Sequence, residues 1–193
     1  MRDESVNPPS ILQQIQRESE LMGFQMASDP LTGSLLRTLA ATKPVGKFLE
    51  LGTGTGIATA WLLDGMDKES RLLTVEQDRE VASIARKYLG HDNRVTFHIE
   101  DAASFLNKCS PQEFDLIFAD TWSGKYFHLN ETLNLVKVGG IYVVDDMLPQ
   151  TNWPENHPPK VERLITVLED RRDLIITKMN WATGLIVAGR VSS

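Results

Sequence analysis

The chain has 193 residues, of which 41% are hydrophobic, and this length fits one globular domain better than two independent domains. Its 26 acidic and 20 basic side chains give a formal net charge of −6, which argues against a nucleic-acid-binding surface and favours a small molecule as partner. One cysteine, Cys109, excludes an intrachain disulfide and a cysteine-built zinc site, and since no apolar run resembles a signal peptide or a membrane span, we expect a cytoplasmic protein.

Two helices are predicted before the first strand. Ser10 is a candidate N-cap for the first helix, which has apolar residues at Ile11, Leu12 and Ile15. The second helix is expected to begin after Asp29-Pro30. We therefore divide the single domain into a helical segment, residues 1–45, and a core, residues 46–193.

A strand, a glycine-rich turn and a helix are predicted over residues 47–63. Glycine recurs at Gly52, Gly54 and Gly56, and the helical spacing of apolar residues begins with Ile57. Glycine lets the main chain approach a ligand closely, and N–H groups at a helix start can face polar ligand atoms. A dinucleotide fingerprint would need its third glycine at position 57. The turn predicts a cofactor loop, with tight strand–helix packing as the structural alternative.

Strands and helices alternate through the rest of the chain. Strands are predicted over residues 71–78, 94–101, 114–120 and 141–146, and a final pair over 174–180 and 183–191. Helices are predicted over residues 79–89, from residue 101, from residue 126 to about 136, and over 160–171, with Gly139-Gly140 in a turn. The fold class is α/β: a single-domain, doubly wound, Rossmann-like sheet of seven strands, mostly parallel with one antiparallel C-terminal strand, and helices on both faces.

Acidic residues stand at the ends of several predicted strands. Glu76 lies 20 residues after Gly56, where a carboxylate can accept hydrogen bonds from a ribose. Asp120 follows the strand over 114–120, and Asp145 and Asp146 end the next strand. Ligands of open α/β sheets bind outside the carboxyl ends of the strands, so we expect these side chains to border the functional site.

Three motifs carry a resemblance to a known family. The pattern Glu50-x-Gly52-x-Gly54-x-Gly56 resembles motif I of class I S-adenosylmethionine (SAM)-dependent methyltransferases. Together with Asp120-x-Trp122-x-x-x-Tyr126 and Gly139-Gly140-x-x-x-x-Asp145-Asp146, it makes the chain similar to catechol and caffeoyl-CoA O-methyltransferases from about Met26 onward. The resemblance implies a SAM-dependent O-methyltransferase that acts on a hydroxyl of a small, catechol-like molecule.

The resemblance also implies roles for individual residues. SAM binding falls on the glycine loop and on strand-end residues: Glu50, Gly52, Thr53, Gly54, Gly56, Glu76, Asp101, Ala102 and Asp120. The helices of residues 1–45 would cover this cofactor site. Asp120, Asp145 and Asp146 would bind Mg²⁺ or Ca²⁺, since three carboxylates at one edge repel unless a cation or protons neutralise them. Trp122 and Trp153 would wall the acceptor. The sequence leaves the oligomeric state open, with a homodimer as one candidate.

The chain departs from this family at two positions. Relatives carry a lysine, the proposed general base, where this chain has Ser123, and an asparagine where it has Asp146. Lys125, His128 and His157 are candidates to accept the proton instead, although these residue types are also common on solvated surfaces. We take Asp120 and Lys125 as the predicted catalytic residues.

Three other functions stay open. The first is SAM-dependent methylation of a nitrogen, although the chain lacks the Asn/Asp-Pro-Pro-aromatic motif that amino-methyltransferases often have after strand four. The second is a SAM-binding protein without catalysis, which the absent lysine favours. The third is a NAD-dependent oxidoreductase, which Ile57 disfavours.

Overall fold

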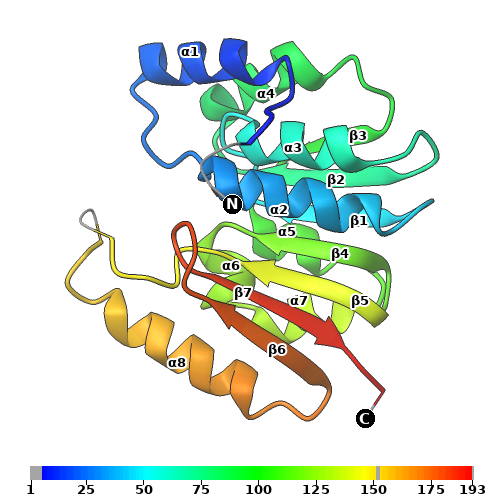
Figure 1. Cartoon of the computed structure of the whole chain (residues 1–193), viewed down its shortest axis with the longest axis vertical. Coiled ribbons are helices and arrows are strands. Elements are labelled where there is room, and N and C mark those ends of the chain that lie inside the picture. Colours follow the sequence, from blue (N-terminus) through cyan, green and yellow to red (C-terminus); the bar gives the residue numbers. More distant parts are fainter. Residues whose placement is uncertain (1–5, 151–152, 193) are drawn as a thin grey trace.

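The structure is a computed structural model that describes residues 6–150 and 153–192. Seven strands form one sheet in the order β3-β2-β1-β4-β5-β7-β6 (Figure 1). The strands are β1 (Lys47–Leu51), β2 (Arg71–Glu76), β3 (Val95–Ile99), β4 (Phe114–Ala119), β5 (Val136–Val144), β6 (Leu174–Met179) and β7 (Leu185–Arg190). All seven predicted strands are therefore present in the described part of the chain.

The strand directions agree with the prediction. Strand β7 pairs antiparallel with both β5 and β6, and the pairs among β1 to β5 are parallel. The chain runs from β1 outward to β3 and then returns to place β4 on the other side of β1. This reversal lies between β1 and β4, and ligands of doubly wound folds bind at such a point.

Helices cover both faces of the sheet, as predicted. Their bounds are α1 (Leu12–Met22), α2 (Pro30–Ala41), α3 (Ile57–Gly65), α4 (Arg79–Leu89), α5 (Ala102–Leu106), α6 (Trp122–Lys125), α7 (Leu129–Leu135) and α8 (Pro158–Glu169). Helices α1 to α4 bury their apolar residues on one face, with Leu36 and Trp61 fully buried, and α5, α7 and α8 do so on the other. Figure 1 views the first face, with α2 in front of β1.

A side-chain cap explains where α2 begins, and the cap predicted for α1 is wrong. The Asp29 side chain accepts the N–H of Leu31 at 2.7 Å, and Pro30 occupies the first turn of α2, as expected. Helix α1 begins after Ile11 without a side-chain cap, so Ser10 is not its N-cap. The N–H of Leu12 donates to the carbonyl of Pro9 instead, at 2.9 Å.

The segment after β4 also differs from the prediction. The helix expected from residue 126 to about 136 is present as α7, but it begins three residues later, because His128 has a left-handed φ of 55°. Gly139-Gly140 does not precede β5 but lies inside it, where the pairing with β4 shifts register. Glycine in a strand often marks such an irregularity.

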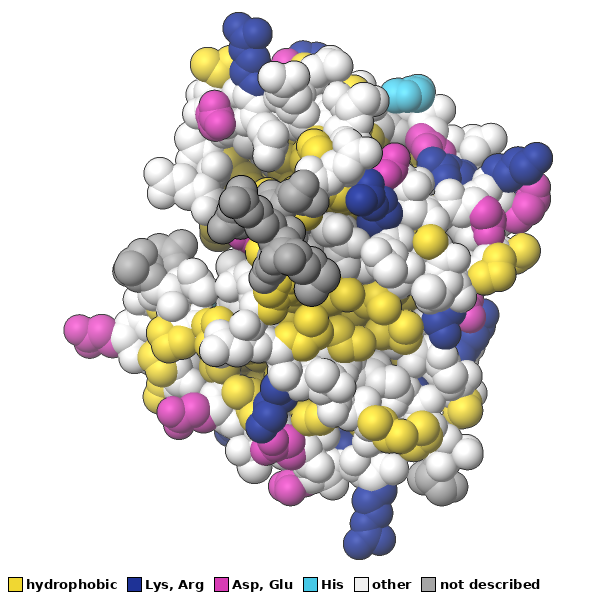
Figure 2. Space-filling model, in the orientation of Figure 1, with side chains coloured by type: hydrophobic (Ala, Val, Ile, Leu, Met, Phe, Trp, Pro, Cys, Tyr) yellow, Lys and Arg dark blue, Asp and Glu magenta, His cyan; other side chains and the backbone are white. Residues whose placement is uncertain are grey.

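The surface of the first face has an apolar region. Figure 2 shows hydrophobic side chains gathered in the middle of this face. The half-buried hydrophobic residues that pack on this side of the core include Leu35, Leu39, Ile141 and Val187. Separately, none of the helices that the structure describes is both long enough and apolar enough to cross a membrane.

Candidate functional site

A cleft of about 910 Å³ opens at the carboxyl edge of the sheet, where the strand order reverses. It is lined by residues 24–29 between α1 and α2, and by the segments that follow β1, β2, β3, β4 and β5. Most residues predicted for the cofactor, the cation and the acceptor line it: Gly52, Thr53, Gly54, Glu76, Asp101, Ala102, Asp120, Trp122, Lys125, Asp145, Asp146 and Trp153. Glu50 and Gly56 are not among its lining residues.

The glycine loop folds tightly against its neighbours. Gly52 has a φ of +97°, and a β-carbon there would lie 2.8 Å from the carbonyl oxygen of Asp120. Gly56 has a φ of +95° and faces Ala85 of α4, 2.8 Å from where its own β-carbon would be. Positive φ and close approach both require glycine. Both glycines pack closely against their neighbours, and Gly52 and Gly54 also line the cleft.

Glu76 and Asp101 keep the neighbouring loops in place while they line the cleft. Glu76 accepts the N–H of Gly54 at Oε2 and the N–H of Asp78 at Oε1, both at 3.0 Å. Asp101 caps α5 by accepting the N–H of Ser104 at 2.9 Å. Asp101 therefore caps α5 and also lies beside the cleft.

Glu50 lies beneath the glycine loop. Its side chain is completely buried, and Oε2 accepts hydrogen bonds from the hydroxyls of Thr59 on α3 and Thr74 on β2, both at 2.5 Å. Burial raises the pKa of Glu50 to about 7, against the effect of these two hydrogen bonds. The motif I acid thus links β1 to α3 and β2 and does not face the cleft.

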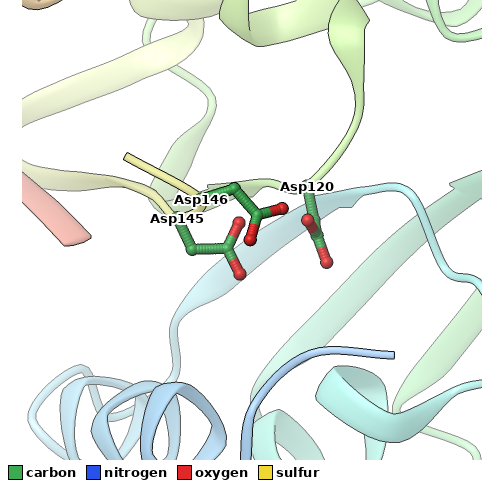
Figure 3. Close-up of side chains that lie close together, drawn as sticks. All are labelled: Asp120, Asp145 and Asp146. Atoms are coloured by element: carbon green, nitrogen blue, oxygen red, sulfur yellow. The ribbon is translucent and has the colours of Figure 1, made fainter. Parts of the chain in front are cut away.

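The three predicted cation ligands do come together (Figure 3). One carboxylate oxygen from each of Asp120, Asp145 and Asp146 lies within 4.8 Å of the others. The strand register explains this meeting, because Ala119 pairs with Val144 and the next residue of each strand is an aspartate. Asp120 Oδ2 also accepts the hydroxyl of Ser28 at 2.9 Å, a contact from the loop before α2 that the sequence analysis did not identify.

Lys125 lies among these carboxylates and not on the solvated surface that its residue type suggests. Only 5% of its side chain is exposed. Its Nζ lies 3.1 Å from Asp145 Oδ1, 3.6 Å from Asp120 Oδ1 and 4.0 Å from Asp146 Oδ2. It also donates to the carbonyl oxygen of Asp145 at 3.2 Å.

The turn at Gly124 directs Lys125 to this position. Gly124 has a φ of +95°, and a β-carbon there would lie 2.6 Å from Leu51 Cδ1. The hydroxyl of Tyr142 donates to the carbonyl oxygen of Gly124 at 2.6 Å and fixes the turn from strand β5. A residue with a side chain at position 124 would disturb both the backbone and the contact with β1.

Burial and charge set the protonation of the cluster. Burial raises the pKa of Asp120 well above its usual value, and the charge of Asp145 raises it further, while Lys125 opposes both. The pKa of Asp146 is raised by the same causes. Burial alone would lower the pKa of Lys125, but the charges of Asp145, Asp120 and Asp146 raise it above its ordinary value. Lys125 is therefore an ammonium at neutral pH and is unsuited to accept a proton.

Aromatic side chains form one wall of the cleft. The ring of Trp153 lies 4.3 Å from that of His157, and Trp122 meets Tyr126 edge-on at 6.1 Å between ring centroids. The hydroxyl of Tyr126 is 3.0 Å from His157 Nε2. Burial, followed by the charges of Lys160 and Lys125, lowers the pKa of His157, so its imidazole is neutral at pH 7.

Of the three residues considered as proton acceptors, Lys125 and His157 line the cleft and His128 does not. His128 instead lies 3.9 Å from Glu131 at the start of α7, with 39% of its side chain exposed. The described structure thus leaves His157 as the neutral imidazole at the site.

The sequence matches one known family over most of its length. A family profile described as O-methyltransferase matches residues 2–181. A putative O-methyltransferase of Mycolicibacterium vanbaalenii is 29% identical over 61% of this chain and 54% of its own length. A catechol O-methyltransferase of Niastella koreensis is 29% identical over 62% of this chain and 57% of its own length. The chain spans little more than half the length of these curated relatives.

Solved structures share the fold. The O-methyltransferase TomG of Streptomyces achromogenes, involved in tomaymycin synthesis and solved in complex with SAM, superposes with a TM-score of 0.83. That comparison covers 98% of this chain and 93% of TomG at 23% sequence identity. Identity at this level establishes a common fold, and function has to be argued from the site.

Proposed function

The chain belongs to the O-methyltransferase family, and from this premise we propose that it transfers a methyl group from SAM to a hydroxyl of a small molecule. The observation that carries the proposal is the position of the cleft. Its lining joins the glycine loop, the strand-end acid Glu76 and the cluster of Asp120, Asp145 and Asp146 at the reversal of strand order.

The residues of one part of the cleft fit SAM. The loop of Gly52, Thr53 and Gly54 carries no bulky side chain toward the space, and Glu76 offers a carboxylate suited to two ribose hydroxyls. Asp101 and Ala102 border the region expected for the adenine. When bound, SAM supplies an electrophilic methyl group on its sulfonium sulfur. Glu50 supports this loop from below through Thr59 and Thr74 and is not proposed to contact SAM.

The other part of the cleft suits an aromatic acceptor. Trp122 and Trp153 offer aromatic rings to the cleft, and Asp120 and Lys125 offer polar groups to the same cleft. A flat apolar body with one polar end matches this arrangement, which agrees with a phenolic or catechol-like molecule. Alignment of the reacting hydroxyl is the main contribution that such a site makes.

His157 is the proposed acceptor of the hydroxyl proton. It lines the cleft, its imidazole is neutral at pH 7, and Tyr126 connects it by a hydrogen bond at 3.0 Å to the segment after β4. Lys125, one of the three candidates from the sequence, holds its own proton too firmly for this task. Its proposed role is to orient the acceptor oxygen as a positive charge.

Binding of Mg²⁺ or Ca²⁺ by Asp120, Asp145 and Asp146 stays a prediction. Oxygen ligands from three carboxylates suit either ion. The arrangement of these side chains fits a divalent ion poorly, however, because the ammonium of Lys125 faces an oxygen of each of them at 3.1–4.0 Å.

A homodimer also stays a prediction. The apolar region on the face that carries α2 gives such an assembly a plausible surface, since large exposed apolar patches often mark interfaces. Light scattering after size-exclusion chromatography measures the oligomeric state directly, and a monomeric mass would contradict the prediction.

Calorimetric titration of the metal-stripped protein with S-adenosylhomocysteine (SAH) tests the cofactor proposal. Saturable binding that weakens in Glu76→Ala supports it, and Glu80→Ala is the matched control because Glu80 is exposed on α4 outside the cleft. Formation of SAH from SAM with a panel of phenols, catechols and amines then separates the functions. Transfer to amines alone would contradict the O-methyltransferase proposal, and SAH binding without turnover on any acceptor would favour a SAM-binding protein without catalysis.

A further inference from the structure

We infer that Lys125 is a built-in cation that replaces the divalent metal ion in this chain, so that SAM binding and methyl transfer proceed without added metal. This inference rests on the proposed function, because it concerns how the same cleft orients the acceptor hydroxyl. The observation behind it is that one buried ammonium lies between the three carboxylates that would otherwise be the metal ligands.

The contacts of Lys125 are those of a structural cation. Nζ lies 3.1 Å from Asp145 Oδ1 and 3.6 Å from Asp120 Oδ1, with Asp146 Oδ2 at 4.0 Å. Within the described residues, both of its hydrogen bonds go to Asp145, one to the carboxylate and one to the carbonyl oxygen. Buried charges are stable when they are paired and hydrogen-bonded in this way.

A metal ion and this ammonium would compete for the same oxygens. Mg²⁺ and Ca²⁺ bind carboxylate oxygens at about 2.0–2.6 Å, so an ion shared by three aspartates lies between their oxygens. In this structure Lys125 Nζ faces an oxygen of each aspartate, and two like charges at such a distance repel strongly in a buried site. Entry of a metal ion would therefore require Lys125 to leave.

The position of Lys125 is fixed by its neighbours and is not a chance rotamer of a long side chain. Gly124 turns the chain with a φ of +95°, and Tyr142 holds the carbonyl of Gly124 with a hydrogen bond of 2.6 Å. Only 5% of the lysine side chain is exposed. Moving Nζ out of the cluster would thus disturb the packed turn at Gly124, which lies against Leu51.

The exchange of metal for ammonium changes what the acceptor must offer. A divalent ion with open coordination positions can hold two adjacent oxygens at once. An ammonium offers N–H donors to single oxygens and has no coordination sphere to fill. We therefore expect this site to accept molecules with one hydroxyl on the ring, and not only those with two adjacent hydroxyls.

The test is direct measurement of Mn²⁺ binding, by electron paramagnetic resonance on metal-stripped protein in the presence of SAH. The expected result is no saturable binding by the wild type and saturable binding by Lys125→Met. The Kd of the variant should lie at least about 100-fold below the highest Mn²⁺ concentration tested on the wild type, because a positive charge has been removed from the site. Lys125→Arg keeps the charge and should bind no Mn²⁺. Lys47→Met is the matched control and should behave as the wild type. It removes an exposed lysine at the first residue of β1, whereas the cleft lies at the carboxyl end of that strand.

Two outcomes would overturn the inference. One is saturable Mn²⁺ binding by the wild type that Asp145→Asn abolishes, which needs no lysine variant and so stands even if Lys125→Met does not fold. The other is a folded Lys125→Met that still binds no Mn²⁺. Failure of the wild type to bind SAH, with or without metal, would instead refute the proposed function. Turnover that EDTA leaves unchanged would support the proposed function and the inference about Lys125.

Discussion

Replacing Lys125 by methionine should destabilise the protein substantially at neutral pH. Methionine preserves most of the volume and removes the charge, which leaves Asp120, Asp145 and Asp146 facing one another without a cation. At an effective dielectric constant of about 20, unit charges separated by the 3.1 Å between Nζ and Asp145 Oδ1 attract by about 5 kcal/mol. Desolvation of the ammonium offsets part of this attraction, and removal of one partner from a buried ion pair typically costs about 3–5 kcal/mol.

The expected change is large enough for simple thermal denaturation. In a domain of this size each kcal/mol corresponds to about 2–4 °C, so we expect the midpoint of Lys125→Met to fall by about 6–20 °C at pH 8. Lys47→Met is the matched control. In the wild type, Lys47 Nζ lies 3.4 Å from Glu113 Oε1 and more than half of the Lys47 side chain is exposed, and surface ion pairs of this kind contribute about 0–1 kcal/mol. Equal midpoints for the two variants at pH 8 would refute the buried position of Lys125.

The same variant has a predicted dependence on pH. The pKa of Lys125 is raised in the folded protein, so its stabilisation is complete below its ordinary pKa and is lost only as pH rises through the higher folded value. Toward acid, Asp120 and Asp146 take up protons at higher pH than usual, because burial and Asp145 raise their pKa values. The deficit of Lys125→Met should therefore shrink as the pH falls from 9 toward 5. A deficit that grows toward acid would contradict the assignment.

Three further predictions concern the glycine loop and its supports. Glu76→Ala should weaken SAH binding by about 10- to 150-fold in calorimetry, since hydrogen bonds to a charged group contribute about 1.5–3 kcal/mol, and unchanged affinity would remove Glu76 from the site. Gly52→Ala should lose at least about 1–3 kcal/mol of stability in urea denaturation, because its φ of +97° and the 2.8 Å approach to Asp120 leave no room for a β-carbon. Glu50 has a folded pKa raised to about 7, so the wild type should lose up to about 3 kcal/mol of stability as pH rises from 4.5 to above 7. Glu50→Gln should show a flatter profile over that range, and an equally steep one would assign the pH dependence to another group.

The sequence was sufficient to predict the sheet and the meeting of the acids. Apolar runs ended by acids mark β2, β4 and β5, and parallel strands bring their carboxyl ends to one edge, so Asp120 and Asp145 had to be close. The antiparallel position of β7 followed from a terminal pair of strands with a short connection.

The surroundings of individual side chains were harder to predict. Glu50 stands in a cofactor motif, but its burial depends on how α3 and β2 supply Thr59 and Thr74, which lie 9 and 24 residues away. The contact of Ser28 with Asp120 spans 92 residues and has no local signal. Such contacts are decided by tertiary packing and not by local preference.

The position of a lysine relative to the acid after β4 decides which role it can have. The resembling family carries its lysine at position 123, which lines the cleft, and this chain has serine there. The chain turns at Gly124, and the lysine of this chain, Lys125, lies two residues after Ser123 with its ammonium in the carboxylate cluster. A lysine so paired stays protonated, which is why we propose His157, whose pKa is lowered and which also lines the cleft, as the proton acceptor. The serine at position 123 and the buried ammonium at position 125 thus support one proposal, in which Lys125 orients the acceptor and His157 takes its proton.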